Sequence, residues 1–327
     1  MSNVREMRYV NAVAQALSDS MTADSSVVIL GEDVAQAGGS FKATRGLLET
    51  FGPQRVIDTP ISEAAITSAA VGMALTGLKP VVEIMFMDFV TLSMDALVNQ
   101  AAKARYMFGG QGSVPMVLRT PHGGGLSAGP QHSQCLEAWL AHVPGLKVVC
   151  PSNPQDVYSL LRAAIADPDP VVFVEHKGLY ASKGSVDTTQ SARIGKARVA
   201  RSGRDVSVVS YGATVAVCLA AAQQLAQEGV EVEVLDLRSI QPWDKAAVLE
   251  SLARTHRAVV VHEAVQSFGV GAEIVATLAD EGFDELDAPI LRVAAPFMPA
   301  PFASSLEQGY VVTVERVVSS IRRVLVH

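Results

Sequence analysis

The segments Asp58-Thr59-Pro60-Ile61-Ser62-Glu63 and Glu83-Ile84-Met85-Phe86-Met87-Asp88-Phe89 decide the fold of this chain. The first segment leads into a helix of small residues, and the second closes a strand. Together they place one acidic side chain at a helix entry and one aromatic ring at the end of the next strand. Such a pair can hold a flat, nitrogen-containing ring by its edge and by its face.

Short apolar runs rich in valine and isoleucine alternate with helical stretches along nearly the whole chain. This pattern predicts an α/β fold in which helices flank a parallel sheet. The expected strands are apolar on both faces, as in sheets that are covered on both sides. In the first half we expect strands at 27–30, 55–58, 80–86, 115–119, 146–150 and 171–175, and helices at 64–78, 94–106 and 155–166.

A polar stretch at 177–205 interrupts this alternation and has weak periodicity, which is typical of a linker. We therefore expect a first domain at 1–180, a linker at 181–204 and a second domain at 205–327. In the second domain we expect strands at 206–210, 231–237, 258–261 and 290–293, and helices at 214–228, 245–252, 272–281 and 314–324.

The bulk composition excludes several classes of protein. A length of 327 residues suits two domains, and a charged fraction of 18% is low enough to predict a buried subunit interface. The net charge of −7 argues against nucleic-acid binding, and no apolar run is long enough to cross a membrane. The three cysteines have no paired spacing, which argues against a disulfide framework or zinc site and favours a cytoplasmic location.

The two opening segments resemble the pyrimidine-binding half of thiamine diphosphate enzymes. More narrowly, the chain is similar to the beta subunit of the decarboxylase component of 2-oxoacid and acetoin dehydrogenase complexes. The resemblance extends through Gly31-Glu32-Asp33-Val34 and Pro144-Gly145-Leu146-Lys147-Val148-Val149 to Asp287-Ala288-Pro289-Ile290. It implies a thiamin-type pyrimidine-binding domain followed by a transketolase-like C-terminal α/β domain.

Glu63 has two interpretations. In the first turn of a helix, a glutamate stabilises the helix dipole by about 0.3–1 kcal/mol. The resemblance implies instead that Glu63 bonds a ring nitrogen of the cofactor aminopyrimidine and favours the imino form, which takes the proton from the thiazolium carbon. It also implies that Phe89 stacks on this ring, with Met85 and Ile61 beside it, although Phe89 and Met85 equally suit core packing.

His132 follows a loop at 121–129 that is rich in glycine and other small residues. A histidine there could simply cap the next helix, whereas the resemblance implies an active-site histidine that acts on the substrate and the lipoyl group. Gly123, Gly125 and Gly129 also approximate a dinucleotide fingerprint. Their spacing is one residue too long and no ribose-binding acid follows, and the pair Gly269 and Gly271 lacks the same acid.

The segment 163–170 ends a helix, and its two prolines account for this without any function. Carbonyl groups left unpaired at a helix end can also hold a cation. The resemblance implies a structural potassium ion at this turn. The residues that it assigns to the ion are Met116, Ala164, Ile165, Asp167 and Asp169.

The chain contains no Gly-Asp-Gly segment, the motif with which thiamine enzymes hold magnesium and the diphosphate. The resemblance implies that an alpha subunit supplies this half, in an alpha2beta2 heterotetramer that serves a lipoyl acyltransferase core. The segments 105–110, 85–89 and 282–287 are most similar to acetoin enzymes, with pyruvate, another 2-oxoacid and a biosynthetic acyl donor left open. The alternatives are a non-catalytic scaffold subunit and an NAD-dependent dehydrogenase.

Overall fold

The computed structural model describes residues 4–326, so residues 1–3 and 327 at the outer ends of the two expected domains lie outside it. The chain divides into two compact units. The first contains the residues up to His122 and Trp139–Ile194, and the second contains Gly123–Ala138 and the residues from Gly195 onward. Within residues 4–326, no helix combines the length and the apolar character that a membrane crossing requires.

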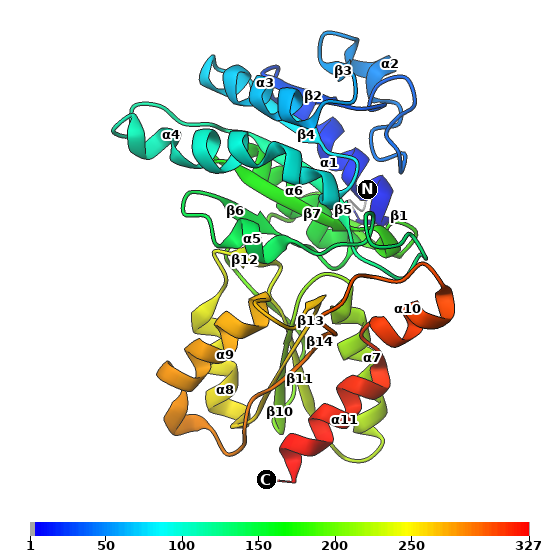
Figure 1. The fold of residues 1–327 in the computed structure, drawn as a ribbon, viewed down its shortest axis with the longest axis vertical. Coiled ribbons are helices and arrows are strands. Elements are labelled where there is room, and N and C mark those ends of the chain that lie inside the picture. The colour runs from blue at the N-terminus through cyan, green and yellow to red at the C-terminus, as the bar shows by residue number, and fades with distance from the viewer. Residues whose placement is uncertain (1–3, 327) are drawn as a thin grey trace. The chain divides into compact units, whose positions relative to one another are not determined.

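The first unit is built on a parallel sheet with the strand order β6-β7-β5-β4-β2-β3 (Figure 1). The parallel arrangement confirms the prediction from the alternating pattern. In chain order these strands are β2 (Val27–Gly31), β3 (Val56–Asp58), β4 (Lys79–Glu83), β5 (Val117–His122), β6 (Lys147–Val149) and β7 (Val171–His176).

Both faces of this sheet are covered, because successive side chains of a strand point to opposite sides. Ile29, Val81 and Phe173 face one core, which they share with α1 (Tyr9–Ala23) and α6 (Pro154–Ala166). The residues between them, such as Val82 on β4, are equally buried but do not belong to that core. Helix α3 (Glu63–Leu75) lies against β4.

The remaining elements up to Ile194 are short. Strands β1 (Val4–Arg8) and β8 (Lys183–Asp187) form a separate antiparallel pair. The short helices are α2 (Leu47–Phe51), the 3-10 helix η1 (Met87–Ser93), the π-helix η2 (Ala96–Ala101), α4 (Ala102–Met107), α5 (Glu137–Ala141) and the 3-10 helix η3 (Lys177–Leu179).

The second unit contains a sheet with the order β14-β13-β10-β11-β9, in which only β9 is antiparallel to its neighbour. Helices α7 and α11 share one core with this sheet, whereas α8 and α9 lie against its strands through other residues. The elements are β9 (Arg198–Arg201), β10 (Val206–Ser210), α7 (Thr214–Ala226), β11 (Val232–Asp236), β12 (Ser239–Gln241), α8 (Lys245–Thr255), β13 (Ala258–Val265), α9 (Val270–Glu281), η4 (Phe283–Glu285), β14 (Leu291–Ala295), α10 (Ser304–Tyr310) and α11 (Val314–Leu325).

The stretch predicted as a linker contains two strands, β8 and β9. The apolar pattern did not predict these strands, because their residues are largely polar. Polar residues are tolerated there, since β8 pairs only with the exposed β1 and β9 lies at the edge of its sheet. Strand β4 ends at Glu83, three residues before the predicted end. Apolar character alone does not separate a strand from a buried turn, and this limit explains the error.

A buried ion network joins the carboxyl ends of β4, β5 and β7. Arg119 is 1% exposed and donates to Glu83 at 2.8 Å and to both carboxylate oxygens of Glu175 at 2.7 and 2.9 Å. Tyr180 donates a further hydrogen bond to Glu175 at 2.8 Å. Burial alone would lower the pKa of Arg119, but its attraction to Glu175 and Glu83 outweighs burial and raises the pKa.

We expect Arg119→Met to lower the free energy of unfolding by about 3–5 kcal/mol, because it leaves two buried carboxylates without a counter-charge. Denaturant titration of the purified chain measures this loss. The control is Lys245→Met, which removes an exposed pair with Glu281 and should cost about 0–1 kcal/mol. Equal losses in the two variants would show that the network does not stabilise the sheet.

Candidate active site

Three neighbouring parallel strands of the first unit end at Gly31, Asp58 and Glu83, and the chain that follows each strand carries a site candidate. Ligands of parallel α/β sheets bind at the carboxyl edge of the strands, which is where these segments begin. Glu32 follows β2 directly, and Glu63 begins α3 soon after β3. The sheet therefore gathers the candidates by its topology.

Glu63 is the first residue of α3. Although helix ends are often exposed, this residue is buried, with an exposed fraction of 6%. Its carboxylate has no hydrogen bond or ion pair with any residue of the described range 4–326. Its backbone carbonyl accepts a bond from Ser93 at 3.0 Å, and Ser93 accepts one from Thr67 at 2.7 Å. These bonds tie the start of α3 to the end of η1, so they fix the backbone that carries the Glu63 side chain.

Glu32 is a second buried acidic residue, and the sequence pattern alone did not identify it. Its Oε1 atom has no hydrogen-bond partner among the described residues. Burial raises the pKa of Glu32, and repulsion from Glu63 and from Asp33 raises it further. In the sequence, the signal for Glu32 is the acidic pair Glu32-Asp33 directly after a fully buried strand. Because Glu63 raises the pKa of Glu32, the two carboxylates belong to one electrostatically coupled site.

Phe89 lies in η1 and not at a strand end as predicted. After Glu83 the chain turns, and the Phe89 N–H donates to the Phe86 carbonyl at 3.0 Å. The two rings pack edge to face, with centroids 6.0 Å apart. Phe89 and Met85 are half-buried, whereas Ile61 is 83% exposed and lies between β3 and α3.

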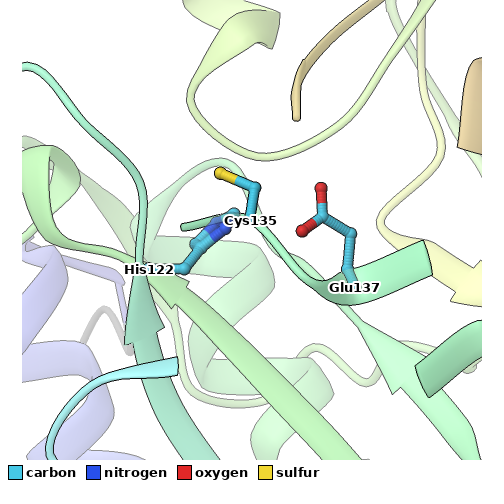
Figure 2. A group of neighbouring side chains, drawn as sticks. All are labelled: His122, Cys135 and Glu137. Atoms are coloured by element: carbon cyan, nitrogen blue, oxygen red, sulfur yellow. The ribbon is translucent and has the colours of Figure 1, made fainter. Parts of the chain in front are cut away.

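His132 lies on the segment Gly123–Ala138, which belongs to the second unit. The side chain of His132 is half-buried, and its backbone N–H donates to the Gly129 carbonyl at 3.4 Å. Figure 2 shows Cys135 and Glu137 on this segment and His122 at the end of β5. Tyr211 on the second unit donates to the Glu137 carboxylate at 2.8 Å, so this part of the segment is anchored through a side chain.

The glycine loop (residues 123–129) uses its amide groups internally. The Gly124 N–H donates to Glu263 at 2.6 Å, and those of Gly125 and Ser127 donate to Glu307 at 2.7 and 2.8 Å. Two carboxylates therefore occupy the amides that a dinucleotide phosphate would need, and their charge repels a phosphate. This loop is unsuited to binding a dinucleotide.

The second glycine pair also has a packing explanation. A Cβ atom at either Gly269 or Gly271 would lie 2.7 Å from the ring of His262, which is fully buried on β13. Burial lowers the pKa of His262 to about 4, so the ring is neutral at pH 7. A larger residue at either position would clash with this buried ring, which explains the two glycines. They therefore give no support to a phosphate site.

The turn proposed for potassium offers backbone oxygens. The Asp167 N–H donates to the Ala164 carbonyl at 3.2 Å, and the Val171 N–H donates to the Met116 carbonyl at 3.0 Å. Each carbonyl keeps a second lone pair. The carboxylate of Asp167 is bonded by Lys147 at 2.7 Å, and that of Asp169 is paired with Arg105. At this turn the carbonyls of Met116 and Ala164 can therefore accept a cation, while the carboxylates of Asp167 and Asp169 already have cationic side chains as partners.

Comparison with known proteins agrees with this architecture. Residues 5–183 match the family model "Transketolase, pyrimidine binding domain", and residues 195–317 match "Transketolase, C-terminal domain". The chain is 44% identical to the rice (Oryza sativa subsp. japonica) protein "Pyruvate dehydrogenase E1 component subunit beta-2, mitochondrial", over 98% of this chain and 86% of the relative.

The chain is also 44% identical to "Acetoin:2,6-dichlorophenolindophenol oxidoreductase subunit beta" of Bacillus subtilis (strain 168), over 94% of both sequences. Among solved structures, "Split gene transketolase, inactive beta4 tetramer" superposes with a TM-score of 0.81 over 98% of each chain. That protein is only 21% identical to this chain, so the likeness concerns the fold.

Proposed function

The chain belongs to the family of beta subunits of pyruvate and acetoin dehydrogenase enzymes, which join a transketolase pyrimidine-binding domain to a transketolase C-terminal domain. We propose that it is the beta half of a thiamine-diphosphate-dependent alpha2beta2 enzyme. This enzyme cleaves acetoin, or decarboxylates pyruvate or a related 2-oxoacid, and passes the acyl group to a lipoyl domain. A cytoplasmic location and an acyltransferase core as partner are part of this proposal.

The side chain of Glu63 is the observation that carries the proposal, because the residue is 6% exposed and its carboxylate has no donor among residues 4–326. The carboxylate oxygens of Glu63 can therefore accept a hydrogen bond from a ligand, and a heterocyclic ring nitrogen is such a donor when protonated. Neighbouring Glu32 adds negative potential, which favours a proton on a basic ring nitrogen next to Glu63. The half-buried Phe89 and Met85 supply the apolar contacts that a flat ring needs.

When bound, thiamine diphosphate supplies the nucleophilic carbon that adds to the carbonyl group of the substrate. In this proposal, Glu63 holds a proton on the aminopyrimidine, and Phe89, Met85 and Ile61 orient the ring. His132 donates or accepts a proton as the substrate and the lipoyl group react, since the two nitrogens of an imidazole ring can serve as donor and acceptor. The magnesium and the diphosphate are held by the alpha subunit, because this chain has no Gly-Asp-Gly segment.

We predict that the purified chain alone binds thiamine diphosphate poorly and shows no decarboxylase activity, because it lacks the groups for the charged end of the cofactor. Isothermal titration with cofactor and magnesium tests this, first on the chain alone and then after co-expression with an alpha subunit of the same enzyme family. Binding should appear only with the pair. Tight, magnesium-dependent binding by the chain alone would refute the two-subunit site.

The roles of Glu63 and His132 can be separated. Glu63→Gln should slow hydrogen–deuterium exchange at the thiazolium carbon, because glutamine bonds the ring but does not stabilise its protonated form. His132→Ala should leave this exchange almost intact while acyl transfer to a lipoyl domain falls by about 10²–10⁴-fold. NMR exchange and a lipoyl acylation assay on the assembled enzyme measure the two effects. Normal exchange in Glu63→Gln would mean that the activating carboxylate is misassigned.

For the turn at 164–169, we predict that potassium raises the melting temperature more than sodium. A cation at ten times its Kd would add about 1.4 kcal/mol, and each kcal/mol corresponds to roughly 2–4 °C for a domain of this size. Thermal unfolding of cation-depleted protein in potassium, sodium and choline chloride at equal ionic strength measures this, with choline as the control for screening. Equal melting curves in potassium and sodium would exclude a selective site.

A further inference from the structure

The carboxylate of Glu307 fills a cradle of amide groups in the glycine loop. Glu307 lies on α10 and is 4% exposed. Its Oε1 atom accepts the Gly125 N–H at 2.7 Å, and its Oε2 atom accepts both the N–H and the hydroxyl of Ser127 at 2.8 and 3.2 Å. Amide groups of one loop that converge on an anion, as those of Gly125 and Ser127 do, form an anion-binding site, and here the anion belongs to the same chain.

The backbone of the loop shows why a clamp is needed. Ser127 has a φ of 53°, a left-handed conformation that costs a non-glycine residue free energy. Such a residue keeps its conformation only when its surroundings fix it, and both hydrogen-bond donors of Ser127 end on Glu307. The bonds to Glu307 therefore offset the strain at Ser127.

Further contacts within the second unit hold the same segment. Glu263 at the end of β13 accepts the Gly124 N–H, and Tyr211 donates to Glu137. A Cβ atom at Gly129 would lie 2.2 Å from the ring of Phe302, so the loop packs directly against that ring. Although the flanking sequence belongs to the first unit, the segment that carries His132 is fixed by the second unit.

We propose that Glu307 is a positioning residue for His132. Its carboxylate locks the glycine loop in a strained conformation, and through the loop it sets the place of His132, which follows shortly after. Glu263 assists by accepting the N–H of Gly124. This inference rests on the proposed role of His132, and it gives the C-terminal domain a part in the reaction.

The test is Glu307→Gln, because glutamine has one acceptor atom where the carboxylate uses two. Amide hydrogen exchange in peptides that cover 123–131 should accelerate about 10-fold or more in the folded, full-length variant, since charge-assisted bonds to a buried group are lost. In the assembled enzyme, acyl transfer should fall while thiazolium exchange stays intact. Combined with His132→Ala, the variant should cause little further loss, because both changes act through one side chain.

Two further variants calibrate this result. Glu281→Gln removes a charge from an exposed pair with Lys245 and should leave exchange at 123–131 and acyl transfer unchanged. Glu263→Gln should accelerate exchange by only about 2- to 5-fold, since an amide oxygen can still accept a single N–H. If Glu307→Gln does not fold, Glu263→Gln remains the test, and unchanged loop exchange there counts against the clamp.

Unchanged exchange at 123–131 in folded Glu307→Gln would overturn the clamp. A loss of acyl transfer that adds in full to that of His132→Ala would overturn the link to His132. If His132→Ala itself leaves acyl transfer intact, the assigned role of His132 is wrong, and the functional half of this inference fails with it. Loop exchange then decides the clamp alone, so the two failures can be told apart.

Discussion

The buried network of Arg119 with Glu83 and Glu175 is the constraint on which the rest of the first unit depends. It joins the carboxyl ends of three neighbouring strands, and its charges are satisfied only while those strands keep their register. The loop after β2 closes over it, since a Cβ atom at Gly39 would lie 3.3 Å from Glu83. Because breaking one partner of such a network is costly, the edge of the sheet that carries the candidate site is rigid.

Buried glutamates have three different roles in this chain, and the partner decides which. Glu83 and Glu175 are matched by an arginine and serve stability. Glu307 is matched by backbone amides and serves to fix a loop. Glu63 has no hydrogen-bond partner for its carboxylate within residues 4–326, and it is coupled to Glu32, so this pair of carboxylates is suited to meet a ligand. Burial alone does not mark a functional acid, because the groups that the acid meets decide its role.

Much of the fold could be predicted because strand and helix periodicities are local properties of the sequence. The predicted strand at 206–210 coincides with β10, and α3 begins at Glu63, one residue before the predicted start. The strands β8 and β9 could not be predicted, because their polar residues satisfy pairing at an exposed edge and not burial. The aromatic ring of Phe89 was assigned to a strand, since an apolar run looks alike in a strand and in a buried turn.

The sequence by itself determined the alternation of strands and helices, the acidic residue at the entry of α3 and the lack of a diphosphate motif. Only the tertiary structure decided what each acid meets. It paired Arg119 with two glutamates from distant strands, coupled Glu32 to Glu63, and placed Glu307 in the amides of a loop some 180 residues earlier in the chain. The reason is physical: periodicity is encoded between near neighbours, whereas the partner of a buried charge is chosen by whichever segments packing brings together.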